Sequence, residues 1–447
     1  MPWLVHVQNS WAKSTPSPDA DNIFEISNSI VAVDPDHGIN GWYPIDSSAW
    51  LFVEAAQKVG EISDDHFELD GGVLPQLEVS VPKLAPLDLT LGDPEEPLRS
   101  LSSKITDEAL LKLHRDGFVI VDQALSPALC ETLRHEMDIL LENGQMWDSQ
   151  SYSHEEGALH HDICETTLDF KDVRFYAPTF TRMGTDEGLL RVLRRLPVLR
   201  DLSMQHLRLQ INKGNGGCYT MHTDSGVSGE EDGRQVLRVT ALFYLNEGWT
   251  SEHGGELRVY PYPSAPVKIA PLLGRLVLFH PRLVHEVLPN FRKRYCFTLW
   301  CAVEQSSTSS HFMEDLESMT CFNQACSVCE KATHLEKTPR SKLLQVPRPL
   351  RCLLLPEVRP LLVRYVFRDC ELQSACRSHD EGPQKQEMLE GIGRYHQQMR
   401  DENPQWFRQL LEQLPGAEVG TARAARLGSY ELKEVMRSCC PWWEDAA

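Results

Sequence analysis

The middle of the chain is a series of short apolar runs separated by turns that contain glycine, proline or asparagine. The runs expected to form β-strands lie at 239–245, 254–260, 274–279 and 294–300. The first is apolar throughout, as in a strand buried on both faces, whereas the last alternates between apolar and polar residues. Many short strands in series predict a β-sandwich or a barrel.

Helical patterns flank these strands on both sides. Ser126 and Pro127 predict an N-cap and a first helical position, and Gly144 is placed to end that helix. A second helix is expected over 186–206, with an interruption at Pro197. A third is expected over 385–414, where an apolar face offers either packing on the rest of the protein or a surface for a partner. The chain is therefore expected to be an α+β protein.

Proline and composition divide the chain into four expected parts. Residues 1–74 mix short apolar runs with tryptophans and predict a small N-terminal module with β-structure, whose role the sequence does not indicate. Residues 75–104 are rich in proline and acidic residues and predict an extended linker. The strands and helices of 105–304 form one expected domain. Residues 305–447 form a cysteine-containing, mainly helical C-terminal region.

Composition narrows the cell compartment and the partners. The 447 residues carry a formal net charge of −20, which argues against nucleic acid as a partner because phosphate binding needs a basic surface. No stretch approaches the roughly twenty apolar residues of a membrane span, and the first residues lack the layout of a secretion signal. The 13 scattered cysteines favour reduced thiols. We expect a cytoplasmic or nuclear protein with no membrane partner; the oligomeric state is left open.

One short motif carries the strongest chemical signal. In an extended strand, residues two apart point to the same face, so His222 and Asp224 can reach one metal ion. His285, at the end of a later segment, supplies a second imidazole. Two histidines and one carboxylate on one face of an octahedron leave three positions open, which is the arrangement of non-haem Fe(II) oxygenases.

Arg294, nine residues beyond His285, adds a carboxylate-binding group to that motif. A guanidinium presents a rigid fork of donors and stays charged when it is partly desolvated, so it suits the anchoring of a carboxylate. Thr298 and Trp300 share its face of the alternating segment, and Tyr244 lies in the apolar strand. Thr298 and Tyr244 are candidates to donate to the same carboxylate, although a tyrosine in an apolar strand is as often core packing. Trp300 is expected to be core.

Two other clusters have competing interpretations. His160, His161 and Asp162 repeat the His-x-Asp spacing, but no strand pattern or downstream partner supports them as ligands. Cys321, Cys326, Cys329 and His334 lie within fourteen residues and offer four zinc ligands. Only the Cys326–Cys329 spacing is typical of zinc sites, so reduced, unpaired cysteines are the favoured interpretation.

With these residues in view, the region from Gly117 to Glu304 resembles the prolyl 4-hydroxylase group of Fe(II)/2-oxoglutarate dioxygenases, nearest the intracellular, oxygen-sensing type and its microbial relatives. The resemblance implies a double-stranded β-helix, or jelly roll, flanked by helices. It also implies that His222, Asp224 and His285 bind iron and form the catalytic centre, that Arg294 pairs with the 5-carboxylate of 2-oxoglutarate, and that Tyr244 and Thr298 assist. Many relatives carry a tyrosine where this chain has Asn212, so the substrate pocket is expected to differ there and in the 225–234 loop.

Three functions fit the pattern. The first is hydroxylation of a peptidyl proline in a protein or peptide substrate, with Fe(II), 2-oxoglutarate, O2 and ascorbate as reductant, and with release of succinate and CO2, as the resemblance implies. The second is a dioxygenase of the same class that acts on a small molecule or on another side chain. The third is a catalytically silent interaction protein, against which the intact metal ligands argue. A halogenase is disfavoured because that chemistry replaces the carboxylate ligand with a small residue, and Asp224 is present.

Overall fold

The computed structural model describes residues 82–86, 97–149, 162–224, 235–262, 264–304, 359–379, 381–401 and 442–443, together with the backbone of strands between residues 6 and 44. The chain divides into two compact units. The first comprises Met1–Val79 and Glu336–Arg351, and the second comprises Ser80–Leu335 and Cys352–Ala447. The expected division into four parts stays a prediction.

The described part of the first unit contains short β-strands. Strands β1 (His6–Val7) and β2 (Ser10–Trp11) pair antiparallel. Strands β3 (Ile23–Ile26), β4 (Ser29–Asp34) and β5 (Gly38–Pro44) form an antiparallel sheet in that order.

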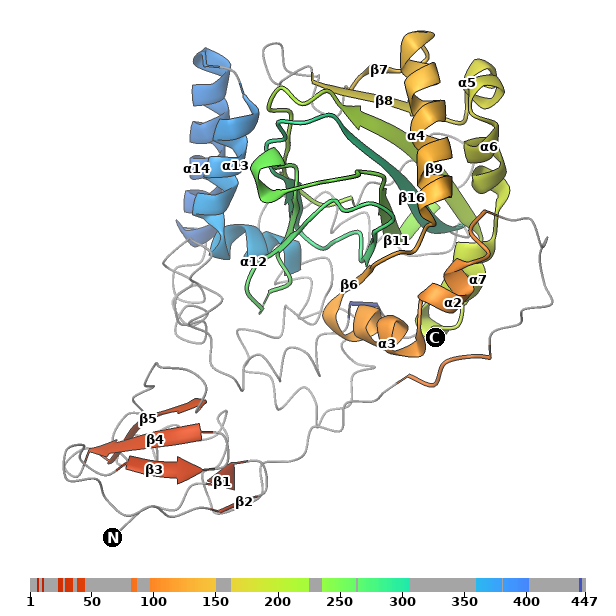
Figure 1. Ribbon diagram of the computed structural model, residues 1–447. Helices are drawn as coiled ribbons and strands as arrows, with labels where there is room; N and C mark the ends of the chain where they lie inside the picture. The colour runs from red at the N-terminus through yellow and green to blue at the C-terminus, as the bar shows by residue number, and fades with distance from the viewer. Residues whose placement is uncertain are drawn as a thin grey trace. The chain divides into compact units, whose positions relative to one another are not determined.

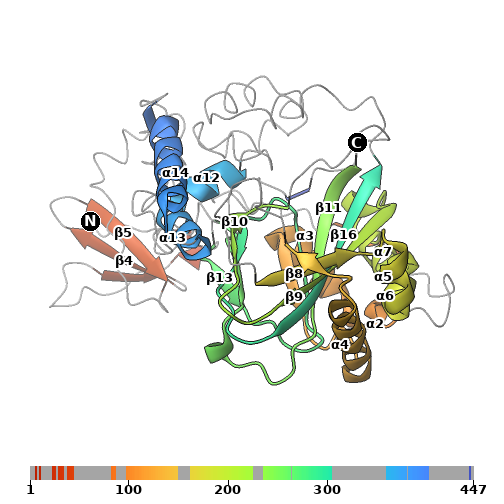
Figure 2. The same cartoon turned by 90° about the horizontal axis from the view of Figure 1, so that it is seen from above.

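Two antiparallel sheets form the centre of the second unit (Figures 1 and 2). The order in the larger sheet is β6-β14-β11-β16-β9-β8-β7, and in the smaller it is β10-β15-β12-β13. The larger sheet comprises β6 (Phe118–Val121), β7 (Trp147–Asp148), β8 (Ile163–Thr167), β9 (Met204–Asn212), β11 (Gln235–Tyr244), β14 (Leu276–Phe279) and β16 (Arg294–Glu304). The smaller comprises β10 (Tyr219–His222), β12 (Leu257–Val259), β13 (Val267–Ile269) and β15 (His285–Val287). The α+β fold with a jelly-roll core is confirmed.

Helices cover the outer face of the larger sheet (Figure 2). They are α2 (Leu101–Lys104), α4 (Pro127–Glu142), α5 (Lys171–Tyr176), α6 (Pro178–Thr185) and α7 (Gly188–Leu193), whereas α3 (Asp107–Asp116) packs against β6. Phe180 of α6 packs edge-on against Phe297 of β16, which stacks on Phe243 of β11 with ring centroids 4.6 Å apart. Buried aromatic contacts of this kind hold the helical layer on the sheet.

The predicted start of α4 is confirmed in detail. The hydroxyl of Ser126 accepts a hydrogen bond from the backbone N–H of Leu129, and Pro127 occupies the first turn, where its missing N–H costs nothing. Leu133, Met137 and Leu140 form the buried stripe.

The helix expected over 186–206 is wrong in its second half. Helix α7 ends at Leu193, Pro197–Leu199 forms a single 3-10 turn, and β9 begins at Met204. From there the burial alternates through Leu207, Leu209 and Ile211, which is the period of a strand. Pro197 therefore ends the helix rather than interrupting it.

Three C-terminal helices belong to the same unit. They are α12 (Arg359–Val366), α13 (Arg368–Ser378) and α14 (Pro383–Asp401), and α13 lies against β10 of the smaller sheet (Figure 2). His396 of α14 bonds the buried Glu371 of α13 at 2.9 Å, so the described part of the expected 385–414 helix packs internally. Residues 402–414 lie outside the described part of the chain. None of the described helices is long and apolar enough to cross a lipid bilayer.

Gly117 lets the chain close tightly where α3 ends. It caps α3 with φ 76°, a left-handed conformation, and a Cβ added there would overlap the indole of Trp442. The neighbouring Trp443 is 1% exposed and donates to the carbonyl of Arg238 at 2.8 Å. Trp442 and Trp443 thus pack on the residue that precedes β6 and on the first half of β11.

Replacing Gly117 tests this contact. Gly144→Ala is the control, because Gly144 is also left-handed but has open space around it. We expect this variant to lose about 1–2 kcal/mol of the free energy of unfolding through backbone strain alone. Gly117→Ala should cost about 1–3 kcal/mol more, because Trp442 must shift. Urea unfolding measures both, and the difference should vanish in a Trp442→Ala background. Equal losses in the two glycine variants would contradict the packing of Trp442 on Gly117.

Candidate metal centre

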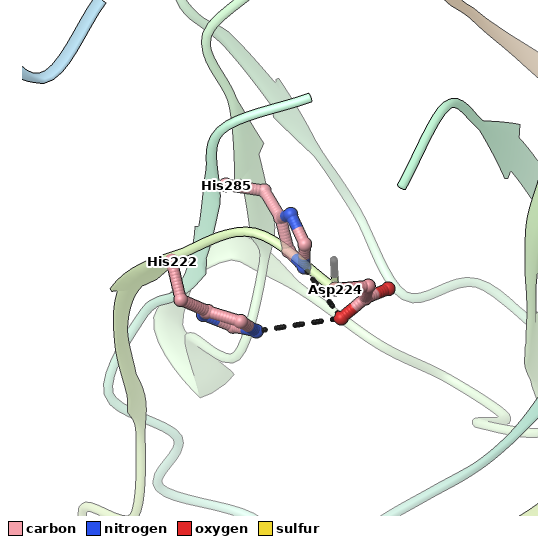
Figure 3. Close-up of side chains that lie close together, drawn as sticks. All are labelled: His222, Asp224 and His285. Carbon is pink, nitrogen blue, oxygen red and sulfur yellow. Dashed lines mark ion pairs between the residues drawn. The ribbon is translucent and has the colours of Figure 1, made fainter. Parts of the chain in front are cut away.

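The three side chains predicted to bind metal lie together between the two sheets (Figure 3). His222 ends β10, and His285 begins the neighbouring β15 directly opposite it. Asp224 follows His222 by two residues, so its carboxylate returns to the same face. The Nε2 atoms of the two histidines each lie 3.7 Å from Oδ1 of Asp224. The structure thus brings the three predicted ligands to one point.

Backbone carbonyls orient both imidazoles. Nδ1 of His222 lies 2.6 Å from the carbonyl oxygen of Thr220, and Nδ1 of His285 lies 2.8 Å from that of Leu283. A carbonyl only accepts, so each Nδ1 carries the proton and each Nε2 presents its lone pair to the common point. Such bonds to the second ring nitrogen fix the ligand tautomer at metal sites.

The larger sheet holds the third ligand. Oδ2 of Asp224 accepts from the hydroxyl of Thr240 at 2.8 Å and from Nε1 of Trp300 at 3.4 Å. Oδ1 is therefore the oxygen that faces the two histidines. Trp300, expected to be core, instead contacts the carboxylate ligand. Thr240 was not identified from the sequence, although it shares a face with Tyr244 four residues along the same strand.

The donor set suits a divalent iron ion. Burial, and to a lesser extent the nearby His222, lower the pKa of His285 to about 4 against the opposing effect of Asp224, so this imidazole is neutral at physiological pH. Two imidazoles and one carboxylate occupy three positions of an octahedron and leave the other three open. That is the donor set and the open geometry of non-haem Fe(II) oxygenases, and the residues present fit such an ion.

A group of buried donors lies on the face of the larger sheet that carries Trp300. Arg294 is 5% exposed, and its guanidinium carbon lies 5.0 Å from the ring centroid of the fully buried Tyr244. Nε and Nη2 of Arg294 and the hydroxyl of Tyr244 make no well-aligned hydrogen bond to any residue that the structure describes. Burial raises the pKa of Tyr244, so its hydroxyl stays a donor. A bound carboxylate would satisfy all three groups.

Thr298 occupies the same face, four residues after Arg294, and is 6% exposed. Two neighbours on this face were not identified from the sequence. Sγ of Cys296 lies 3.4 Å from Nη1 of Arg294, and Gln210 of β9, opposite Cys296, donates to the hydroxyl of Tyr219 at 3.0 Å. Cys296 is two residues from Arg294, so the alternation that placed Thr298 could have indicated it.

Asn212 has a structural contact that sequence reasoning did not anticipate. Its side chain donates to the carbonyl of Gly217 at 2.9 Å and accepts from the N–H of Gly214 and from Nδ2 of Asn290. It therefore closes the turn between β9 and β10. The 225–234 loop lies outside the described residues.

The second His-x-Asp motif, at 160–162, has no described role in metal binding. Asp162 accepts from the backbone N–H groups of Gly214, Asn215 and Gly217 at 2.8–3.1 Å, so it anchors that same turn. It is not part of the metal cluster. His160 and His161 lie outside the described residues, as do Cys321, Cys326, Cys329 and His334.

The hydrogen bond from Thr240 to Asp224 generates a test. We expect Thr240→Val to weaken Fe(II) binding about 10- to 100-fold, the usual effect of losing a partner of a metal ligand. Competition with a chelator under anaerobic conditions measures the affinity. Thr166→Val is the matched control, because Thr166 is fully buried and its hydroxyl has no partner among the described residues. An unchanged affinity in Thr240→Val would show that the bond does not support the ligand.

Comparisons with known proteins agree with this geometry. The family model of the 2OG-Fe(II) oxygenase superfamily matches residues 204–302, from the start of β9 into β16. A hypoxia-inducible factor prolyl hydroxylase of Caenorhabditis elegans is 29% identical over 218 residues, which are 44% of this chain and 28% of that protein. The human prolyl hydroxylase EGLN3 is 36% identical over 91 residues, which are 20% of this chain and 36% of that protein. The matches thus span about a third of these relatives' lengths.

A solved structure of a prolyl 4-hydroxylase from Phytophthora capsici shares the fold. It is 24% identical, with a TM-score of 0.53, and the match covers 76% of this chain and 99% of that one. The superfamily model covers all three residues of the metal cluster, on β10, just after it and on β15, and the carboxylate-binding donors of β11 and β16. Over residues 204–302, which carry this centre, the chain is therefore similar to the 2OG-Fe(II) oxygenase superfamily, and its named relatives are prolyl hydroxylases.

Proposed function

We propose that this protein is a 2-oxoglutarate- and Fe(II)-dependent dioxygenase that hydroxylates a peptidyl proline in a protein substrate. The observation that carries the proposal is the buried guanidinium of Arg294, whose Nε and Nη2 have no well-aligned partner among the described residues. It lies beside the Tyr244 hydroxyl, in the same domain as two histidines and a carboxylate. An enzyme of this class needs both sites at once. The names of the relatives, which are prolyl hydroxylases, support the choice of substrate.

Each residue has a defined task in this proposal. His222, Asp224 and His285 would hold the iron and leave the opposite side open. Arg294 would bind the distal carboxylate of 2-oxoglutarate, with Tyr244 and Thr298 donating to it. When bound there, iron and 2-oxoglutarate supply the oxidising power that places one oxygen atom of O2 in a substrate C–H bond, with release of succinate and CO2. Thr240 and Trp300 keep Asp224 in position.

The partners and the location of the protein are proposed from the relatives' names and from composition. A protein substrate is proposed from the relatives' names, and ascorbate as the reductant from the same group. The charge of −20 supports a site that does not act on nucleic acid. Cys130, Cys164, Cys218, Cys296 and Cys301 are buried free thiols, which supports a reducing compartment, cytoplasmic or nuclear.

Arg294→Gln tests the cosubstrate site. Hydrogen bonds to a charged group contribute about 1.5–3 kcal/mol, so the 2-oxoglutarate concentration for half-saturation should rise about 10- to 150-fold. The visible absorption of the anaerobic Fe(II) and 2-oxoglutarate complex reports the binding. Fe(II) affinity without 2-oxoglutarate should not change.

Arg292→Gln is the control, because its exposed guanidinium binds the carbonyl of Gly248. A His222→Ala variant should abolish the absorption band. If the wild-type protein binds Fe(II) but shows no 2-oxoglutarate complex, the dioxygenase proposal fails and the silent interaction protein takes its place.

The substrate is tested by turnover. Proline-containing peptides should stimulate succinate release from 2-oxoglutarate, and mass spectrometry should find one added oxygen atom on the proline. Peptides with alanine in its place are the control. Succinate release that is stimulated by small molecules and by no peptide would assign the second function in place of the first.

A further inference from the structure

The strand that carries His222 contains an irregularity. Tyr219 of β10 pairs with Val287, and His222 pairs with His285, so three steps along β10 oppose two steps along β15. This extra residue is a β-bulge, which re-aims a side chain and leaves a backbone group without its ladder partner. The bulge thus lies immediately before the first metal ligand.

A serine from the C-terminal region occupies the bulge. The N–H of Met221, the residue before His222, donates to the hydroxyl of Ser374 at 3.0 Å. Ser374 belongs to α13 and is 2% exposed. A buried N–H without a partner costs free energy, so this hydroxyl supports the bulged conformation. It comes from a residue 153 positions away along the chain.

The same hydroxyl also reaches the second histidine strand. It donates to Oε2 of Glu286 at 2.6 Å, and Glu286 follows His285 directly in β15. Because successive residues of a strand point to opposite faces, His285 faces the metal and Glu286 faces α13. Ser374 therefore bonds to the neighbours of both histidine ligands at the same time.

Hydrogen bonds from four side chains hold the carboxylate of Glu286 in place. It is 1% exposed and accepts from Nη1 of Arg258 at 2.9 Å, from the hydroxyl of Tyr260 at 2.7 Å and from Nη2 of Arg377 at 2.8 Å, in addition to Ser374. These four bonds use both carboxylate oxygens, two bonds on each, so the buried charge is fully paired. Arg258 and Tyr260 come from the smaller sheet and its edge, whereas Ser374 and Arg377 come from α13.

We propose that Ser374 is a positioning residue of the metal centre, and that α13 keeps the strands of His222 and His285 in register by binding the bulge and Glu286 together. The proposal rests on the proposed metal site. It makes the C-terminal region part of the metal-binding machinery, although none of its described residues contributes a ligand. A purely structural role for α13 would affect stability and leave the metal unaffected.

Ser374→Ala is the direct test. The substitution leaves the Met221 N–H without this partner, removes one of the two hydrogen bonds to Oε2 of Glu286, and adds no bulk. We expect Fe(II) affinity in the full-length protein to fall about 10- to 100-fold, as on losing a partner of a ligand. Release of Fe(II) to a chelator should accelerate, and the visible band of the anaerobic Fe(II) and 2-oxoglutarate complex should shift or weaken at saturation.

Ser378→Ala is the matched control. Ser378 lies one turn further along α13 and is fully buried. Among the described residues, its hydroxyl bonds to the carbonyl of Ala375 and to His379, both at the end of the helix. It should lose stability to a similar extent and retain Fe(II) affinity within about twofold, because its hydroxyl does not touch the metal-bearing strands.

The outcomes separate the inference from the proposed function. If the wild-type protein shows the absorption band, and Ser374→Ala keeps the same Fe(II) affinity and the same spectrum, the positioning role of Ser374 is overturned and the proposed function stands. Absence of Fe(II) binding in the wild type overturns both. If Ser374→Ala does not fold, Arg377→Gln takes its place, since Arg377 is partly exposed and bonds the same oxygen of Glu286. Its Fe(II) release should be several-fold faster, and an unchanged release rate would then overturn the inference.

Discussion

The site depends on the pairing of two short strands. His222 and His285 are direct partners across β10 and β15, so their imidazoles lie side by side with ring centroids 4.3 Å apart. Asp224 completes the set only because its carboxylate is held from the larger sheet by Thr240 and Trp300. The metal centre is thus formed where the two sheets meet, and it requires both sheets to be in register. A slip of one residue in either strand would turn a ligand to the other face.

The groups that surround the ligands also have separate roles. Carbonyl oxygens of Thr220 and Leu283 set the imidazole tautomers, and burial keeps His285 neutral. By contrast, Nε and Nη2 of the buried Arg294 and the hydroxyl of the buried Tyr244 have no well-aligned hydrogen-bond partner among the described residues. Buried donors without partners are costly in a protein that has no ligand to satisfy them. Glu286 accepts four hydrogen bonds, whereas Arg294 keeps two nitrogens without a well-aligned partner among the described residues. This contrast distinguishes a structural charge from one that is kept for binding.

Much of the site could be predicted because its signals are local. The His222 and Asp224 spacing, the alternation that carries Arg294 and Thr298, and the cap of α4 at Ser126 all follow from one strand or one helix. The helix expected up to residue 206 failed because the pattern after Pro197 is short, and alternation begins only at Met204. Thr240 and Trp300 were missed as ligand supports because their partner, Asp224, is brought close only by the folded sheets. Ser374 and Glu286 lie 88 residues apart, and no local pattern connects them.

The most direct test of the account is a crystal structure of the protein grown anaerobically with Mn(II), which can stand in for Fe(II), and 2-oxoglutarate. The account predicts the metal ion bound by Nε2 of His222, Nε2 of His285 and Oδ1 of Asp224, with the distal carboxylate of 2-oxoglutarate on Nε and Nη2 of Arg294. Metal bound elsewhere, or a guanidinium of Arg294 that bonds only to protein groups, would contradict it.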